Sequence, residues 1–149
     1  MTVEDMALTF VPKLGVRGAV HLLRCFGSAA AIYSASEDEL RSRAELRADI
    51  ARDIANGRGM RDAEREAEYC RRCGITPVAS TDDAYPPLLR EIDDYPAVIY
   101  VNGDVEALTR RSVAFVGTRR MTSYGSRMCD ALMRELSEAA PDVVVVSGL

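Results

Sequence analysis

The fold of this chain is decided by the stretch Ser112-Val-Ala-Phe-Val-Gly-Thr-Arg-Arg-Met-Thr-Ser-Tyr-Gly-Ser126. Its first five residues form a short, nearly unbroken apolar run, which is typical of a parallel strand buried on both faces. Gly117 follows at once and leaves the backbone open to a close ligand. Thr122 and Ser123 are suitable N-caps for a helix, and Val143–Val146 is a second apolar run. The order strand, loop, helix, strand predicts a βαβ unit.

The two loops that follow the strands of a βαβ unit lie side by side at the carboxyl ends of those strands. Exposed backbone N–H groups and a helix N-terminus favour an anion at this edge. The first loop also carries two arginines. The sequence therefore predicts a phosphate-binding site, and its candidate residues are Gly117, Thr118, Arg119, Arg120, Ser147 and Gly148.

Five blocks of the sequence follow one another in an order that is specific to one protein family. They are Tyr85–Leu89, Asp93–Gly103, Val116–Arg119, Tyr124–Gly125 and Val145–Leu149. In these blocks the chain resembles the DNA-processing protein A family, also called DprA or Smf. The resemblance implies a Rossmann-like fold in which Arg119, the arginine of the Val-Gly-Thr-Arg motif, contacts phosphate or the DNA strand.

The family resemblance also implies a function. Members bind single-stranded DNA and load the recombinase RecA during natural transformation, and the full-length form is expected to be a homodimer. The residues themselves agree with the DNA-binding part, because a phosphate-cradling loop with arginine is a suitable site for a strand backbone. Tyr124 follows this loop closely and is a candidate for stacking on bases. RecA as a partner rests on the family alone.

The composition of the chain limits the remaining classes of protein. Its formal net charge is −4, from 19 basic and 23 acidic residues, which argues against a protein that coats nucleic acid over its whole surface. No segment approaches the ~20 apolar residues of a membrane span, and no secretory leader is recognisable. We therefore expect a cytoplasmic protein without membrane contact, whose four cysteines are reduced.

Residues 1–73 are predicted to form a module of short helices. A capping box begins at Ser36, and Gly74 ends the last helix. The pattern over residues 11–26 resembles a helix-hairpin-helix, although Lys13 occupies the position of the first loop glycine. Such a hairpin either donates N–H groups to a DNA phosphate or packs against protein. The family resemblance implies that this module is similar to a sterile alpha motif and that its role is interaction.

Residues 74–149 are predicted to be a partial Rossmann-like DNA-binding domain, which gives an α/β fold class, α+β overall. Strands are expected at Ile75–Val78 and Ala97–Val101, ahead of the βαβ unit. No helix follows the last predicted strand, whereas a parallel sheet needs helices on both faces. The sequence thus predicts a truncated parallel sheet and a chain that is a fragment or a truncated form.

Catalytic and metal motifs are not found in the sequence. It contains no H-E-x-x-H, G-x-S-x-G or P-loop lysine motif, so we expect no enzyme and no cofactor. His21 has no partner at metal spacing, and Cys70 and Cys73 lack the second ligand pair of a zinc site. Two alternatives to the DNA-binding mediator stay open. One is a nucleotide-binding Rossmann enzyme, such as a lysine-decarboxylase-like phosphoribohydrolase, and the other is a protein-interaction module.

Overall fold

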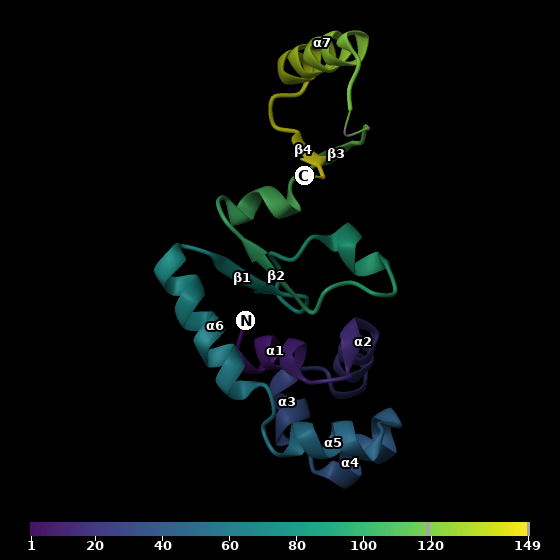
Figure 1. Ribbon diagram of the computed structural model, residues 1–149, viewed down its shortest axis with the longest axis vertical. Coiled ribbons are helices and arrows are strands. Elements are labelled where there is room, and N and C mark those ends of the chain that lie inside the picture. Colours follow the sequence, from purple (N-terminus) through teal and green to yellow (C-terminus); the bar gives the residue numbers. More distant parts are fainter. Residues whose placement is uncertain (119, 149) are drawn as a thin grey trace. The chain divides into compact units, whose positions relative to one another are not determined.

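A computed structural model describes residues 1–118 and 120–148 of the chain. Figure 1 shows its α-helices (α), 3-10 helices (η) and strands (β). In chain order they are α1 (Val3–Ala7), η1 (Leu8–Phe10), α2 (Gly15–Phe26), α3 (Ala29–Ser34), α4 (Glu37–Ala44), α5 (Ala48–Ala55), α6 (Met60–Cys73), β1 (Thr76–Ala79), η2 (Pro87–Glu91), β2 (Val98–Val101), η3 (Val105–Thr109), β3 (Ser112–Phe115), α7 (Ser123–Ala139) and β4 (Val144–Ser147). The mixture of helices and short sheets confirms the α/β fold class. The chain forms two compact units, residues 1–108 and 109–149.

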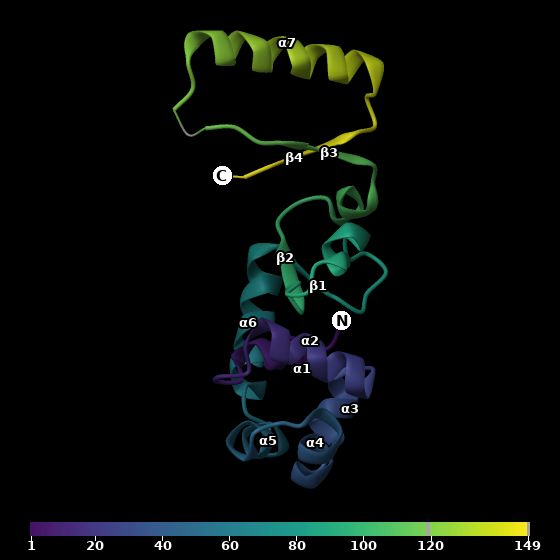
Figure 2. The same cartoon turned by 90° about the vertical axis from the view of Figure 1, so that its right-hand side faces the viewer.

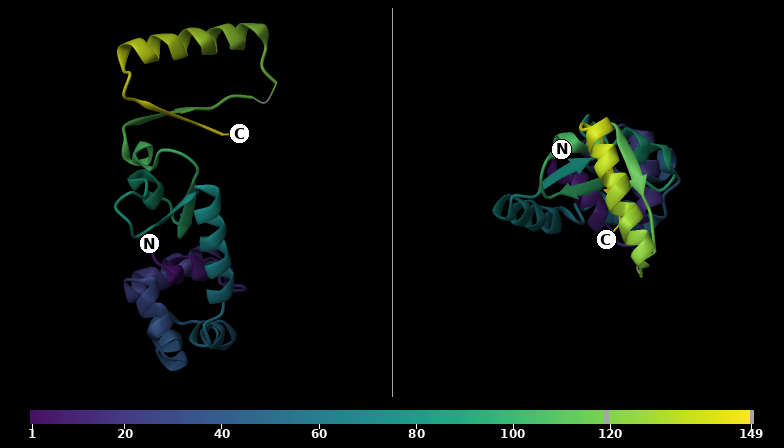
Figure 3. Two further views of the ribbon diagram at one scale, coloured as in Figure 1. Left: turned by 90° about the vertical axis from the view of Figure 1, so that its left-hand side faces the viewer. Right: turned by 90° about the horizontal axis from the view of Figure 1, so that it is seen from above.

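The first unit combines the N-terminal helices with the antiparallel pair of β1 and β2. Helix α6 contacts both α1 and β1, and Figure 3 shows it running beside them. Ala97, which directly precedes β2, belongs to the same apolar core as the helices. The unit therefore continues beyond the predicted end of the helical module at residue 73. A domain boundary near Gly74 stays a prediction.

Helix ends in the first unit follow local signals. The Ser36 hydroxyl accepts the N–H of Glu39 at 3.3 Å, while the Ser36 N–H donates to the Glu39 carboxylate at 2.8 Å. This reciprocal pair is the predicted capping box at the start of α4. Gly27 and Gly74 have φ values of 84° and 67° and end α2 and α6, as expected for glycine in the left-handed region.

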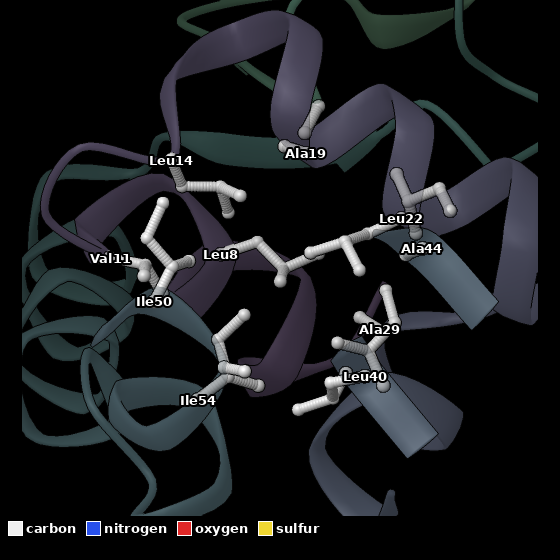
Figure 4. Close-up of a cluster of buried hydrophobic side chains, with 14 residues drawn as sticks. Leu8, Val11, Leu14, Ala19, Leu22, Ala29, Leu40, Ala44, Ile50 and Ile54 are labelled. Carbon is white, nitrogen blue, oxygen red and sulfur yellow. The ribbon is translucent and has the colours of Figure 1, made fainter. Parts of the chain in front are cut away.

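The core of the first unit is built from aliphatic side chains of its short helices. Figure 4 shows Leu8 in the middle of this cluster, with Ile54 of α5 and Leu22 of α2 on either side of it. Tyr85 is also fully buried, and its hydroxyl donates to the Pro96 carbonyl at 2.7 Å. The hydrogen bond explains why this polar tip is tolerated inside the protein.

The predicted hairpin between α1 and α2 is present. Lys13 and Gly15 both have positive φ, 64° and 66°, so the lysine adopts the backbone conformation that the expected glycine would favour. The Lys13 Nζ atom lies 3.3 Å from Asp49 Oδ2, at the start of α5. This ion pair ties the hairpin to the helical unit and favours the role in packing over the role in DNA binding.

The second unit is the predicted βαβ arrangement. Strands β3 and β4 pair in parallel, with register partners from Ser112 and Val144 to Phe115 and Ser147. Helix α7 connects them, and Figure 2 shows it lying along one side of the strand pair. Among the described residues, no helix of either unit has both the length and the apolar character that a bilayer crossing requires.

The prediction that these two strands are buried on both faces is wrong for this structure. Val113 and Val145 are exposed, and Val146 is 54% exposed. The reason is that one helix can cover only one face of a sheet, and α7 is the only helix of this unit in the part that the structure describes.

The sequence spacing of apolar residues in α7 does not by itself identify the face that is buried. The spacing of Met128, Leu132 and Leu136 places them on one side of the helix, yet Leu132 is 47% exposed and Met128 is exposed as well. The half-buried side chains in the middle of the helix are instead Cys129, Ala131, Met133 and Leu136. The expected set and the set of Cys129, Met133 and Leu136 both satisfy helical periodicity. Which set is buried depends on the side of the helix that lies toward the sheet.

Candidate functional site

The predicted phosphate site lies at the carboxyl ends of β3 and β4. Because the strands are parallel and Phe115 is in register with Ser147, the chain leaves both strands at the same edge of the sheet. The structure thus brings the two loops together, and each described candidate is exposed; these are Gly117, Thr118, Arg120, Ser147 and Gly148. Arg119, the sixth candidate, lies outside the described residues.

The two glycines of the site have open space beside their backbones. A Cβ atom added at Gly117 or Gly148 would meet no described atom within 4 Å, and neither residue has positive φ. Packing and backbone conformation therefore do not account for glycine at these positions. A ligand that approaches the backbone closely would account for it.

Short-range hydrogen bonds shape both loops. The Thr118 hydroxyl donates to the carbonyl oxygen of Arg120 at 3.0 Å. The Ser147 hydroxyl lies 3.4 Å from the Gly148 carbonyl. Both hydroxyls retain lone pairs, and a hydroxyl can rotate to donate to a ligand instead.

The start of α7 faces the same loop. Helix geometry leaves the first-turn N–H groups without an intrahelical acceptor, and the Thr122 hydroxyl accepts that of Gly125 at 3.1 Å. Tyr124, which the sequence identified, is 67% exposed, whereas Val116 is 92% exposed and Met121 is exposed too. The sequence does not point to the last two residues. Val116 continues the apolar run of the predicted buried strand, whereas β3 ends one residue earlier.

Replacing Thr122 by alanine should loosen the first turn of α7. The loss of an N-cap costs about 1 kcal/mol, and here it leaves the Gly125 N–H without its 3.1 Å acceptor. Amide hydrogen exchange of residues 124–126 should become severalfold faster. Ser137→Ala is the matched control, because Ser137 lies in the last turns of the same helix. Equal exchange in the two variants would contradict the capping role.

The sequence model of the family described as DNA recombination-mediator protein A matches residues 76–149, which contain both loops, α7 and the two short sheets. Residues 76–149 belong to the DprA/Smf family. Membership confirms the resemblance drawn from the five sequence blocks. The matched segment begins two residues after Gly74, where the sequence predicts that the Rossmann-like domain starts.

Curated DprA and Smf proteins match part of the chain. "DNA processing protein DprA" of Bacillus subtilis is 36% identical over 80 residues, which are 53% of this chain and 26% of the relative. The Streptococcus pneumoniae protein of the same name is 34% identical over 68 residues, 46% of this chain and 23% of its own length. "Protein Smf" of Escherichia coli is 33% identical over 76 residues, which are 48% of this chain and 19% of the Smf protein. The aligned parts are about a quarter or less of these relatives.

Two side chains of the first unit, His21 and Cys70, have the chemistry of metal ligands. The His21 Nε2 atom lies 3.2 Å from the Ala44 carbonyl, which gives this histidine a structural partner. Cys70 is buried, and burial, followed by the charge of Glu66, raises the pKa of its thiol, so it remains protonated. In the described part of the chain no three potential ligands gather around one point as a metal site would require.

Proposed function

We propose that this chain is part of a single-stranded DNA-binding recombination mediator of the DprA/Smf type. In this proposal the strand's phosphates bind at residues 117–120 and 147–148. The observation that carries it is the parallel register of β3 and β4, which brings two exposed, glycine-containing loops to one sheet edge within the family-matched segment.

The chemistry of the two loops suits a flexible polyanion. Guanidinium groups of Arg119 and Arg120 match phosphate geometry, and first-turn N–H groups of α7 add donors that carry no charge of their own. The exposed ring of Tyr124 offers a surface for stacking one base. Each of these contacts is independent of base sequence, so we expect binding with little sequence preference.

Replacing Arg119 by alanine should weaken binding of a fluorescein-labelled oligo-dT strand. One lost phosphate contact lowers the slope of log affinity against log salt by ~0.7 for single strands. We expect a Kd about five times higher at low salt, since an exposed charged contact contributes on the order of 1 kcal/mol. Fluorescence anisotropy at several salt concentrations gives both quantities.

The matched control is Arg134→Ala, which removes an exposed arginine farther along α7. It should leave the salt slope unchanged. Equal weakening by both substitutions would mean that binding follows overall charge, and the loop would no longer be the site. If the wild-type chain did not bind the oligo-dT strand at low salt, DNA binding by this chain would be contradicted.

Partners and assembly are further parts of the proposal. We propose RecA as the protein partner, a homodimer as the full-length assembly, and the cytoplasm as the compartment. Family membership of residues 76–149 supports the first two. Surface plasmon resonance with immobilised RecA tests the partner, and sedimentation equilibrium tests the dimer.

A further inference from the structure

A second basic surface lies in the first unit, at the connection between α5 and α6. It is a hollow of about 640 Å³, with three arginines and two carboxylates among its lining residues. The lining residues are Asn56, Gly57, Arg58, Gly59, Arg61, Asp62, Glu64 and Arg65. The hollow therefore has a local excess of positive charge, whereas the formal net charge of the whole chain is −4.

Two of the three arginines have their guanidinium groups available. Arg65 forms an ion pair with Asp62. Within the described residues, no ion pair involves Arg58 or Arg61, and both side chains are exposed. An anion entering the hollow would therefore gain two guanidinium forks, at the expense of one opposing carboxylate, Glu64.

The backbone around these arginines is held in place before any ligand binds. The Arg58 N–H donates to the Asp53 carbonyl at 2.9 Å, and the Arg58 carbonyl accepts the Tyr33 hydroxyl at 2.8 Å. The Gly57 N–H is bound to the Ile54 carbonyl at 2.9 Å. With its backbone groups satisfied inside the unit, Arg58 presents its side chain to solvent, and little ordering is needed on binding.

We infer that this hollow binds phosphate groups, with Arg58 and Arg61 as the contacting residues. The inference rests on the proposed function for its source of phosphate, the backbone of a single DNA strand. Phosphate is favoured because two guanidinium forks suit bidentate contact and because Gly57 places no side chain in the way of an approaching strand.

A second hollow on the same unit provides a control. It has a volume of about 650 Å³, and three carboxylates face a single arginine there. Its residues are Asp38, Glu39, Arg41, Ser42, Glu45 and Leu46. Removing Arg41 therefore changes the net charge without touching the basic hollow.

The test measures oligo-dT binding by the full chain, using anisotropy. Replacing both Arg58 and Arg61 by alanine should raise Kd about 25-fold at low salt, because each lost contact contributes on the order of 1 kcal/mol, and lower the salt slope by ~1.4, for two phosphate contacts. Arg41→Ala should leave the slope unchanged. Glu64→Gln should tighten binding, a gain that a misfolded variant would not produce.

The outcomes separate this inference from the proposed function. If Arg119→Ala weakens binding while the double variant and Glu64→Gln bind like wild type, the inference is overturned and the proposed function stands. If wild type fails to bind oligo-dT, the proposed function fails. NMR titration with inorganic pyrophosphate then tests whether the hollow binds phosphate. Shifts of the Arg58 and Arg61 Nε–H signals would support phosphate binding from another source. Unmoved signals, or shifts with a polyglutamate peptide only, would overturn it.

Discussion

Replacing Gly59 by alanine is expected to destabilise the first unit by about 3 kcal/mol, from backbone strain and overpacking together. Gly59 has a φ of 93° and directly precedes α6. A Cβ atom there would overlap the carbonyl oxygen of Ala7 and lie 3.3 Å from the Cβ of Phe10. Because the overlapping atom belongs to the backbone of α1, relief requires α1 and α6 to separate.

The other end of the same helix supplies the control. Gly74 also has positive φ, 67°, but a Cβ added there meets no described atom within 4 Å. Gly74→Ala should therefore cost only the strain, about 1 kcal/mol. Urea unfolding followed by circular dichroism compares the two variants, and equal midpoints would contradict the close approach of α1 to α6. A shifted α6 would also disturb the hollow, which Gly59 lines.

Truncating Leu22 to alanine is the second large effect, with an expected loss of about 3 kcal/mol. Leu22 is 0% exposed and lies in the main cluster beside Leu8. The loss combines the removed apolar contacts with the cavity that remains, since short helices on several sides cannot all close on it. The urea midpoint should fall accordingly.

Leu88→Ala is the matched substitution on the surface. Leu88 belongs to the same unit, in η2, and is 69% exposed. Its replacement should change the free energy of unfolding by no more than about 0.5 kcal/mol. If Leu88→Ala proved as costly as Leu22→Ala, the packing described for this unit would be wrong.

The candidate site was predictable to the extent that it depends on strand order. A strand followed by a loop, a helix and another strand brings the two loops to one edge whatever else surrounds them, and β3, α7 and β4 have this order. The choice of Gly117, Thr118, Arg120, Ser147 and Gly148 followed from that topology. Arg119 lies outside the described residues, so its contact with phosphate stays a prediction.

The basic hollow could not be predicted from the sequence. Arg58, Arg61 and Arg65 are scattered among acidic residues, and a charged helix normally indicates only a solvated face. Two contacts of the folded chain support the proposed site. The Arg65 guanidinium pairs with Asp62, which leaves Glu64 as the one opposing carboxylate, and the Tyr33 hydroxyl anchors the Arg58 backbone. Tyr33 is 25 residues away from Arg58 along the chain.

The sequence by itself determined the ends of the helices and the order of the elements in this protein. Ser36 with Glu39 and the glycine at position 74 act through atoms a few residues apart, so no distant partner is needed. Only the tertiary structure decided which apolar residues are buried. Val146 and Leu132 have the character of core residues and are exposed, because burial depends on what packs against a surface and not on the residue that forms it.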